Sequence, residues 1–163
     1  MPNLRQVIEQ LDRFEEGPLR ASLGHRLLAG LLAIACAALL GLAAWLQPDP
    51  RGFGTHNQLR LAPCLWVERV GMPCPTCGMT TAFAHAADGS FLSAARAQPM
   101  GLVLAFMTAM TFWVALYVAA TGSLIGALLL RLWRPSVLWT AGGLALASWL
   151  YKIWDFTREN SLL

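Results

Sequence analysis

The fold is decided by residues 27–46, LLAGLLAIACAALLGLAAWL, a run that contains no charged side chain. A helix of this length extends about 30 Å at about 1.5 Å per residue, which matches the hydrocarbon core of a bilayer. A cleaved signal peptide would have a shorter apolar region, of about 7–15 residues, with a small-residue cleavage site after it. The sequence WLQP stands at residues 45–48 instead, so the run predicts an uncleaved transmembrane helix. Cys36, in its middle, is interpreted as a small apolar filler.

The composition of the chain agrees with a location in the membrane. Hydrophobic residues make up 56 % of the 163 residues and charged residues 13 %, whereas soluble proteins have about 25 % charged residues. A soluble domain of this size has too little interior to bury that much apolar surface. The formal net charge of +3 is spread along the chain, and Lys152 is the only lysine. Nucleic acid binding requires several cations on one surface, so nucleic acid is excluded as a partner.

Two further apolar stretches predict helices that cross the membrane. Residues 100–130 carry no charge, and a single helix of about 46 Å is too long for one crossing. The sequence TGS at 121–123 is the natural break, so the second transmembrane helix is placed at 100–121. The third is placed at 136–154, where Lys152 can extend its ammonium group to the interface.

The sequence therefore predicts an all-α integral membrane protein with about three transmembrane helices. Prolines and glycines interrupt the connection between the first two spans, which is expected to be an irregular cysteine-bearing loop with two short helices, at 80–87 and 90–98. Trp149 is one of five tryptophans near the predicted span ends, where aromatic belts form. In chain order, the single membrane domain of residues 1–163 comprises an amphipathic helix at 1–17, the first span at 27–46, the cysteine loop with its short helices at 47–98, the second span at 100–121, an interfacial segment at 124–134, the third span at 136–154 and a polar tail at 155–163.

Three of the four cysteines lie in this loop, Cys64 first and then Cys74 and Cys77 within PCPTCGMT at 73–80. A Cys-x-x-Cys pair places two sulfur atoms on one side of a tight turn, and three chemistries use that geometry. The first is ligation of zinc or another thiophilic metal, whose closed structural sites take four ligands, so a histidine would complete the set. The second is thiol–disulfide exchange, for which the thioredoxin-like context is absent. The third is a structural disulfide between Cys64 and one of the other two.

The residues near the cysteines are expected either to shape the loop or to complete a metal site. Pro73, Pro75 and Gly78 shape the loop, and Thr80 and Thr81 cap the helix that follows. His85 lies on that helix and would point back toward the cysteine turn, which makes it the candidate fourth ligand of a metal site. His56, in a stretch rich in glycine and polar residues, is interpreted as a solvated loop residue. No paired carboxylates, Ser-His-Asp order or phosphate loop is recognisable, so no catalytic residue is assigned and an enzyme is not expected.

The residues from Cys64 through GMPCPTCGMT at 71–80, followed by DG at 88–89 and QP at 98–99, resemble the bacterial membrane proteins classed as domain of unknown function 2752. The resemblance covers about residues 40–121. It implies a small multi-span protein of the bacterial inner membrane with no established activity. An arginine usually follows the threonine of the family's Cys-Gly-x-Thr pattern, whereas this chain has Thr81, and the usual Asn-Pro is Gln-Pro here, so a shared ligand-binding role carries over less directly.

The positions of the arginines predict the orientation. Arg20 and Arg26 flank the first span, and Arg131 and Arg134 follow the second span with no acid between them. Positive residues gather on the cytoplasmic side of membrane proteins, so the amino terminus is placed in the cytoplasm and the cysteine loop on the outer side.

Two classes of function follow from these observations. In the first, the chain is a non-catalytic subunit or assembly partner of a membrane complex, its partners being the lipid bilayer and another protein or a second copy, and Cys64, Cys74 and Cys77 stabilise the loop. In the alternative, the same cysteines form a working site that binds a metal ion or exchanges thiols and disulfides.

Overall fold

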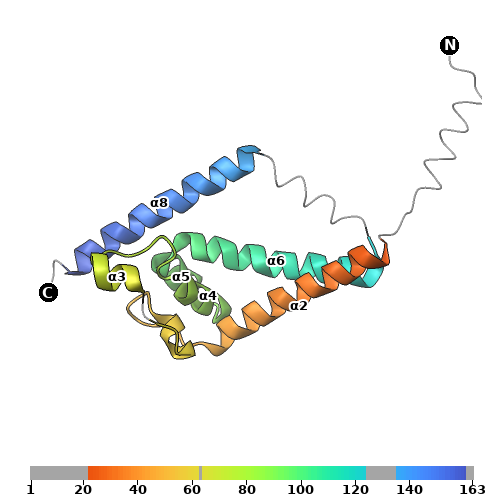
Figure 1. Ribbon diagram of the computed structural model, residues 1–163, viewed down its shortest axis with the longest axis horizontal. Coiled ribbons are helices and arrows are strands. Elements are labelled where there is room, and N and C mark those ends of the chain that lie inside the picture. Colours follow the sequence, from red (N-terminus) through yellow and green to blue (C-terminus); the bar gives the residue numbers. More distant parts are fainter. Residues whose placement is uncertain (1–21, 63, 124–134, 161–163) are drawn as a thin grey trace, which may run out of the picture.

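The computed structural model describes residues 22–62, 64–123 and 135–160 (Figure 1). The described residues form helices and no strands, which confirms the predicted all-α class. In chain order the helices are α2 (Leu23–Trp45), the 3-10 helix η1 (Thr55–Leu59), α3 (Leu65–Val70), α4 (Met79–Ala87), α5 (Phe91–Ala97), α6 (Pro99–Thr121) and α8 (Pro135–Asn160). The predicted amphipathic helix at 1–17, the interfacial segment at 124–134 and the end of the tail at 161–163 lie outside the described residues.

The two long helices α2 and α6 pack against each other in antiparallel directions (Figure 1). The buried positions of α2 are the small residues Ala33, Cys36 and Ala43, which allow the two backbones to approach closely. At the far end from the cysteines, the Arg26 side chain donates hydrogen bonds of 3.0 and 2.9 Å to the carbonyl oxygens of Ala119 and Ala120. These are carbonyls of the last turn of α6, which have no partner within their own helix.

Both helices have the length and composition of membrane spans. Each has 23 residues, and only 11 % and 17 % of their most apolar stretches are buried within the protein. A core helix of a soluble protein would be mostly buried, and the exposed apolar surface of α2 and α6 is consistent with helices surrounded by lipid. Helix α2 begins at Leu23, four residues before the predicted start, and the other three ends lie within one residue of the predicted ones. Pro99 opens α6, and Gly122, with φ of +69°, ends it at the predicted break.

The third helix differs from the prediction of a third apolar span. Helix α8 has 26 residues and is long enough to cross a bilayer, but it does not reach the apolar composition of α2 and α6. It also continues through part of the predicted tail, to Asn160. The ring of Phe156 packs edge-on against Phe53, with 5.8 Å between the ring centroids, which gives this polar stretch a tertiary contact.

The connection between α2 and α6 contains more helix than expected. The two predicted short helices are present as α4 and α5, but η1 and α3 are additional, so the expectation of an otherwise irregular loop is wrong. These short helices gather around the ends of α2, α6 and α8 that lie on one side of the molecule (Figure 1). Their core is small, with Ala82, Ala94 and Ala97 buried together. A methyl group added at Gly101 of α6 would lie 2.8 Å from the Cβ of Ala82, so this glycine permits the close contact of α4 with α6.

Candidate functional site

The first two sulfur atoms of the cluster are held by a tight turn before α4. The backbone N–H of Cys77 donates a 3.0 Å hydrogen bond to the carbonyl oxygen of Cys74, and Met79 N–H donates one of 3.1 Å to Thr76. The chain leaves the turn through Gly78, whose φ of +87° is left-handed. This turn brings the Sγ atoms of Cys74 and Cys77 to 3.4 Å from each other.

The third sulfur atom comes from a different helix. Cys64 is the N-cap residue of α3, and its Sγ lies 3.8 Å from the Sγ of Cys77. The three Sγ atoms lie within 4.8 Å of one another, and no other histidine, cysteine or carboxylate atom among the described residues joins this group. All three thiols are free, so the structural disulfide considered from the sequence is not present. The structure therefore brings together all three cysteines that the sequence singled out.

The three thiols differ in acidity because their surroundings differ. Burial acts to raise the pKa of Cys64, but the nearby backbone N–H groups of Val67 and Trp66 favour its charged form, and the net result is a lowered pKa. Burial, together with the hydrogen bond that the protonated Cys77 thiol shares with Cys74, raises the pKa of Cys77 to about 12. Cys64 is thus the more readily ionised of these two, and Cys77 ionises at neutral pH only if a cation compensates its charge.

Two side chains hold the cysteine turn in place, the half-buried Trp149 and the buried Gln98. The indole Nε1 of Trp149, on α8, donates a 3.1 Å hydrogen bond to the carbonyl oxygen of Pro73. The Nε2 of Gln98, the residue that precedes α6, donates one of 3.1 Å to the carbonyl oxygen of Pro75. The carbonyl groups on both sides of Cys74 are therefore held by hydrogen bonds. From the sequence, Trp149 is expected in a membrane belt and Gln98 at the end of a short helix, and neither residue is expected to have a part in the cysteine turn. Nothing in the sequence distinguishes a tryptophan that serves this purpose from one at a lipid interface.

Gly78 is the loop-shaping residue with the strictest requirement. A methyl group at this position would lie 2.6 Å from the carbonyl oxygen of Ala97 and 2.7 Å from that of Gly52. Both are backbone atoms, so no side chain can turn away to make room. Pro73 is buried and Pro75 exposed, and Thr80 lines the neighbouring cavity without capping α4, whose N-cap residue is Gly78.

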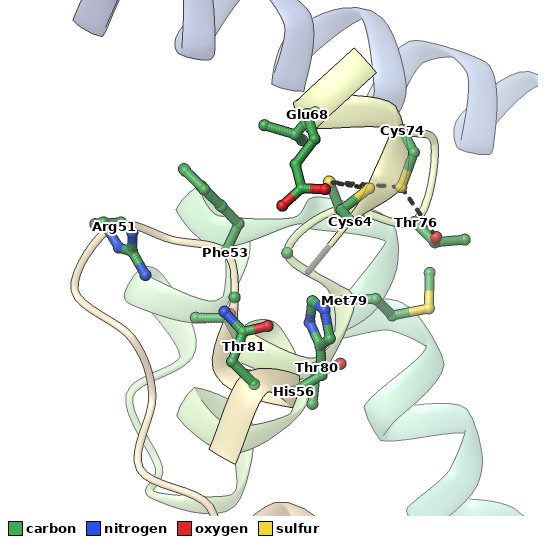
Figure 2. A pocket seen from close by; sticks show the side chains of 15 residues that line it. Arg51, Phe53, His56, Cys64, Glu68, Cys74, Thr76, Met79, Thr80 and Thr81 are labelled. Carbon is green, nitrogen blue, oxygen red and sulfur yellow. Dashed lines mark hydrogen bonds between the residues drawn. The ribbon is translucent and has the colours of Figure 1, made fainter. Parts of the chain in front are cut away.

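The three cysteines line one wall of a cavity of about 580 Å³. Figure 2 shows the side chains around it, with Glu68 on the same side as the sulfurs and Arg51, Phe53 and His56 across from them. The predicted metal ligand His85 does not line this cavity but a second one, beside Arg96 and Lys152. Helix α4 begins after Gly78, so its helical periodicity does not include the cysteine turn, and His85 consequently faces elsewhere. His56, which the sequence analysis treated as a solvated residue, is instead half-buried in the cysteine cavity.

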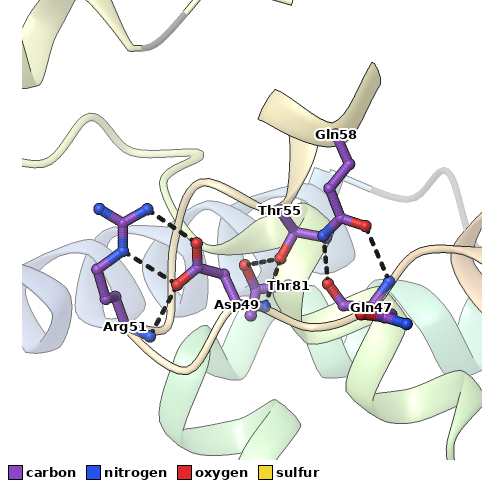
Figure 3. Close-up of polar contacts among 6 residues, drawn as sticks. All are labelled: Gln47, Asp49, Arg51, Thr55, Gln58 and Thr81. Carbon is purple, nitrogen blue, oxygen red and sulfur yellow. Dashed lines mark hydrogen bonds and ion pairs between the residues drawn. The ribbon is translucent and has the colours of Figure 1, made fainter. Parts of the chain in front are cut away.

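A hydrogen-bonded loop closes the opposite wall of the cavity (Figure 3). Thr55 and Thr81 are both fully buried, and their hydroxyl oxygens lie 2.8 Å apart. The hydroxyl of Thr55 also accepts a 2.9 Å hydrogen bond from the N–H of Asp49. The carboxylate of Asp49 pairs with Arg51 at 2.9 Å, and the hydrogen bond from that guanidinium lowers the pKa of Asp49. Thr81 therefore anchors this loop to α4.

The comparison with known families agrees with the residues that form the site. Residues 64–112, from Cys64 to the middle of α6, match the family described as "Protein of unknown function (DUF2752)". None of the curated proteins and none of the solved structures matches the chain.

Proposed function

We propose that this chain, which belongs to the DUF2752 family over residues 64–112, is an integral membrane protein whose Cys64, Cys74 and Cys77 bind a thiophilic metal ion at the membrane surface. The observation that carries this proposal is the convergence of the three sulfur atoms. Sulfur ligands at about 2.3 Å from a tetrahedral zinc ion lie about 3.8 Å from one another. The Sγ atoms of Cys77 and its two neighbours are 3.4 and 3.8 Å apart, close to that spacing.

The donor set is chemically suited to a soft or borderline metal. Thiolates select zinc, copper(I) and iron over magnesium or calcium, and the free thiols of this cluster offer three such ligands. The backbone N–H groups at the start of α3 favour the thiolate form of Cys64. A divalent ion would also compensate the charge of the buried Cys77. The cluster therefore supplies three ligands, and the fourth would be a water molecule or a residue of the shared cavity such as Glu68 or His56.

The described helices support a specific membrane placement for this site. The end of α2, the start of α6 and the end of α8 lie on the side of the molecule where the cysteine segment folds (Figure 1). Helix α8, at about 39 Å, is long enough to cross beside the other two, and all of its charged residues lie from Lys152 onward, in its final turns. We therefore propose three crossings with the cysteine segment on the outer face. Labelling of intact cells with a membrane-impermeant maleimide tests this, since an inner location would leave the three cysteines unlabelled in metal-depleted cells.

Elemental analysis of the detergent-purified protein tests the metal proposal. Protein prepared without chelator is compared with the variant Cys74→Ser and with Cys36→Ser, whose cysteine is buried in α2 away from the cluster. We expect about one metal ion per chain in the wild type and in Cys36→Ser, and none in Cys74→Ser, because two thiolates hold a metal ion far more weakly than three. Absence of metal from the wild type, with thiols found free or bridged by mass spectrometry, would refute the proposal in favour of a purely structural or redox role.

A second candidate function, as a subunit of a membrane complex, is favoured by the surface of α8. A methyl group added at Gly142 or Gly143 would have no neighbour within 4 Å, and Trp139 is 82 % exposed. Small residues on one helix face allow a second helix to approach closely, and we propose a second copy of this chain as the partner. Substitution Gly143→Leu should then reduce the dimer fraction in detergent, measured by light scattering, whereas the equally exposed Gly41→Leu on α2 should not. A monomeric wild type would exclude this arrangement.

A further inference from the structure

A second cavity lies on the other side of the loop that bounds the cysteine cavity. It has a volume of about 520 Å³ and is lined by the loop after α2, by α4 and α5, and by the last turns of α8. Arg51 lines both cavities. A methyl group at Gly52 would lie 3.2 Å from the Lys152 Nζ, so the backbone of this loop covers the lysine directly. The cavity is thus a separate compartment with its own lining, formed where three segments distant in sequence meet.

The lining of this cavity is strongly cationic. One carboxylate, that of Asp155, faces four basic side chains and a histidine, which are Arg51, Arg96, Lys152, Arg158 and His85. Asp49 neutralises one of these cations by pairing with Arg51 at 2.9 Å, but Asp49 does not itself line the cavity. In a chain with a net charge of only +3, this local excess of positive charge is a concentrated feature. Such an excess in a concave site attracts anions.

Lys152 is the most constrained of these cations. Its side chain is only 3 % exposed, and its Nζ lies 3.5 Å from the Oδ2 of Asp155, whose side chain is one-third exposed. The ammonium group therefore does not extend freely into solvent, because the side chain is covered by Gly52 and the ring of Phe53. A buried ammonium group requires compensation by negative charge, and a single partner at this long distance supplies only part of it. An anion in the cavity would supply the remainder.

Arg96 offers the donor groups that such an anion would need. It lies on the exposed side of α5, and its guanidinium donates no hydrogen bond within the part of the chain that the structure describes. A guanidinium presents several N–H groups in one plane, which match the oxygen atoms of a phosphate group. The cavity is thus lined by both a planar donor, Arg96, and a point charge, Lys152.

The position of the cavity relative to the helices indicates the source of the anion. It lies beside the ends of the apolar helices, where the headgroups of a surrounding bilayer would be, and it is lined by Tyr151 and Trp154. Aromatic residues of this kind mark the membrane interface, and basic pockets between membrane helices bind anionic headgroups. We propose that this pocket binds a phosphate group, and that the group belongs to an anionic phospholipid of the bilayer. This proposal is independent of metal binding by the cysteines.

Native mass spectrometry of the full chain in neutral detergent tests this proposal. The probes are phosphatidylglycerol, phosphatidylcholine and inorganic phosphate, each titrated against the wild type, Arg96→Gln and Arg69→Gln. Arg96 is chosen because it is exposed, so that its replacement leaves the buried Lys152–Asp155 pair intact. Arg69 is an exposed arginine of α3 outside the cavity, and its variant carries the same change in net charge.

We expect phosphatidylglycerol to bind more tightly than phosphatidylcholine to the wild type and to Arg69→Gln. Its affinity for Arg96→Gln should fall about fivefold, as for the loss of one cation beside an anionic surface. If Arg96→Gln lowered the affinity for inorganic phosphate alone, and the wild type did not distinguish the two lipids, the phosphate site would stand. Its assignment to a lipid headgroup would be overturned. Equal binding of all probes to Arg96→Gln and Arg69→Gln would overturn the phosphate site itself.

Discussion

The substitution Gly78→Ala should loosen the cysteine turn more than any other alanine substitution of a described glycine in the cysteine segment. Two costs add at this position. A side chain in the left-handed region costs about 1–2 kcal/mol, and a methyl group forced against backbone atoms costs about 1–3 kcal/mol. The added Cβ would lie 2.6 and 2.7 Å from two carbonyl oxygens that belong to separate segments. Alanine has less conformational freedom than glycine in the unfolded chain, and this offsets about 0.4–1 kcal/mol of these costs. The net loss of stability of the turn is about 3 kcal/mol.

The alkylation rate of buried Cys77 in chelator-treated protein measures this loss. If Cys77 reacts only after the turn opens, a loss of about 3 kcal/mol raises its reaction rate about 150-fold, at about 1.36 kcal/mol for each factor of ten. Peptide mapping by mass spectrometry separates this rate from those of Cys64 and Cys74. The melting temperature, followed by circular dichroism in the same detergent, shows whether the opening remains local.

Three matched glycines separate the two costs of Gly78→Ala. Gly71 and Gly89 also have positive φ, of +68° and +76°, but a methyl group at either has no neighbour within 4 Å. Their alanine variants should therefore show the backbone cost of about 1–2 kcal/mol without the steric cost, less the same gain of about 0.4–1 kcal/mol from the unfolded chain. Gly142 is helical with open space around it, so its replacement by alanine should stabilise the protein by about 0.5–1 kcal/mol. If Gly78→Ala and Gly89→Ala were equally destabilising, the argument from the close carbonyl oxygens would be refuted.

The remaining predictions concern the contacts and the acidity of the cysteine turn. Trp149→Phe removes the hydrogen bond to the Pro73 carbonyl and should destabilise the protein by about 1 kcal/mol, with faster alkylation of Cys74; an unchanged rate would show that this bond does not hold the turn. In chelator-treated protein at pH 8, Cys64 should react with iodoacetamide before Cys77. Its lowered pKa makes the thiolate available, whereas a pKa of about 12 leaves Cys77 about one part in ten thousand ionised. Raising the pH should reduce the difference between the reaction rates of Cys64 and Cys77. Equal rates at pH 8 would contradict the lowered pKa of Cys64 and the raised pKa of Cys77.

The cysteine cluster illustrates how far local sequence determines a site. The spacing of Cys74 and Cys77 places their sulfurs together in any tight turn, so this pair was predictable. The approach of Cys64 depends on α3, a helix of only six residues that the sequence did not indicate. His85 was predicted to point toward the cysteine turn, and this prediction was wrong. The helix that carries His85 begins after the turn, so helical periodicity does not relate His85 to the cysteines. A periodicity argument holds only inside one regular element.

The sequence by itself determined the features that depend on length, composition and local backbone preference. Residues 27–46 and 100–121 are apolar over a bilayer thickness, and Pro99 and Gly122 end their helix wherever it packs. Only the tertiary structure decided which polar side chains meet. From the sequence, Trp149 and Lys152 are expected to lie at the membrane interface, like other residues near the end of a span. In the structure, Trp149 donates a hydrogen bond to Pro73 and Lys152 is buried beside Gly52. These contacts join segments about 75 to 100 residues apart, and no local pattern encodes them, because their energy exists only after the segments have packed together.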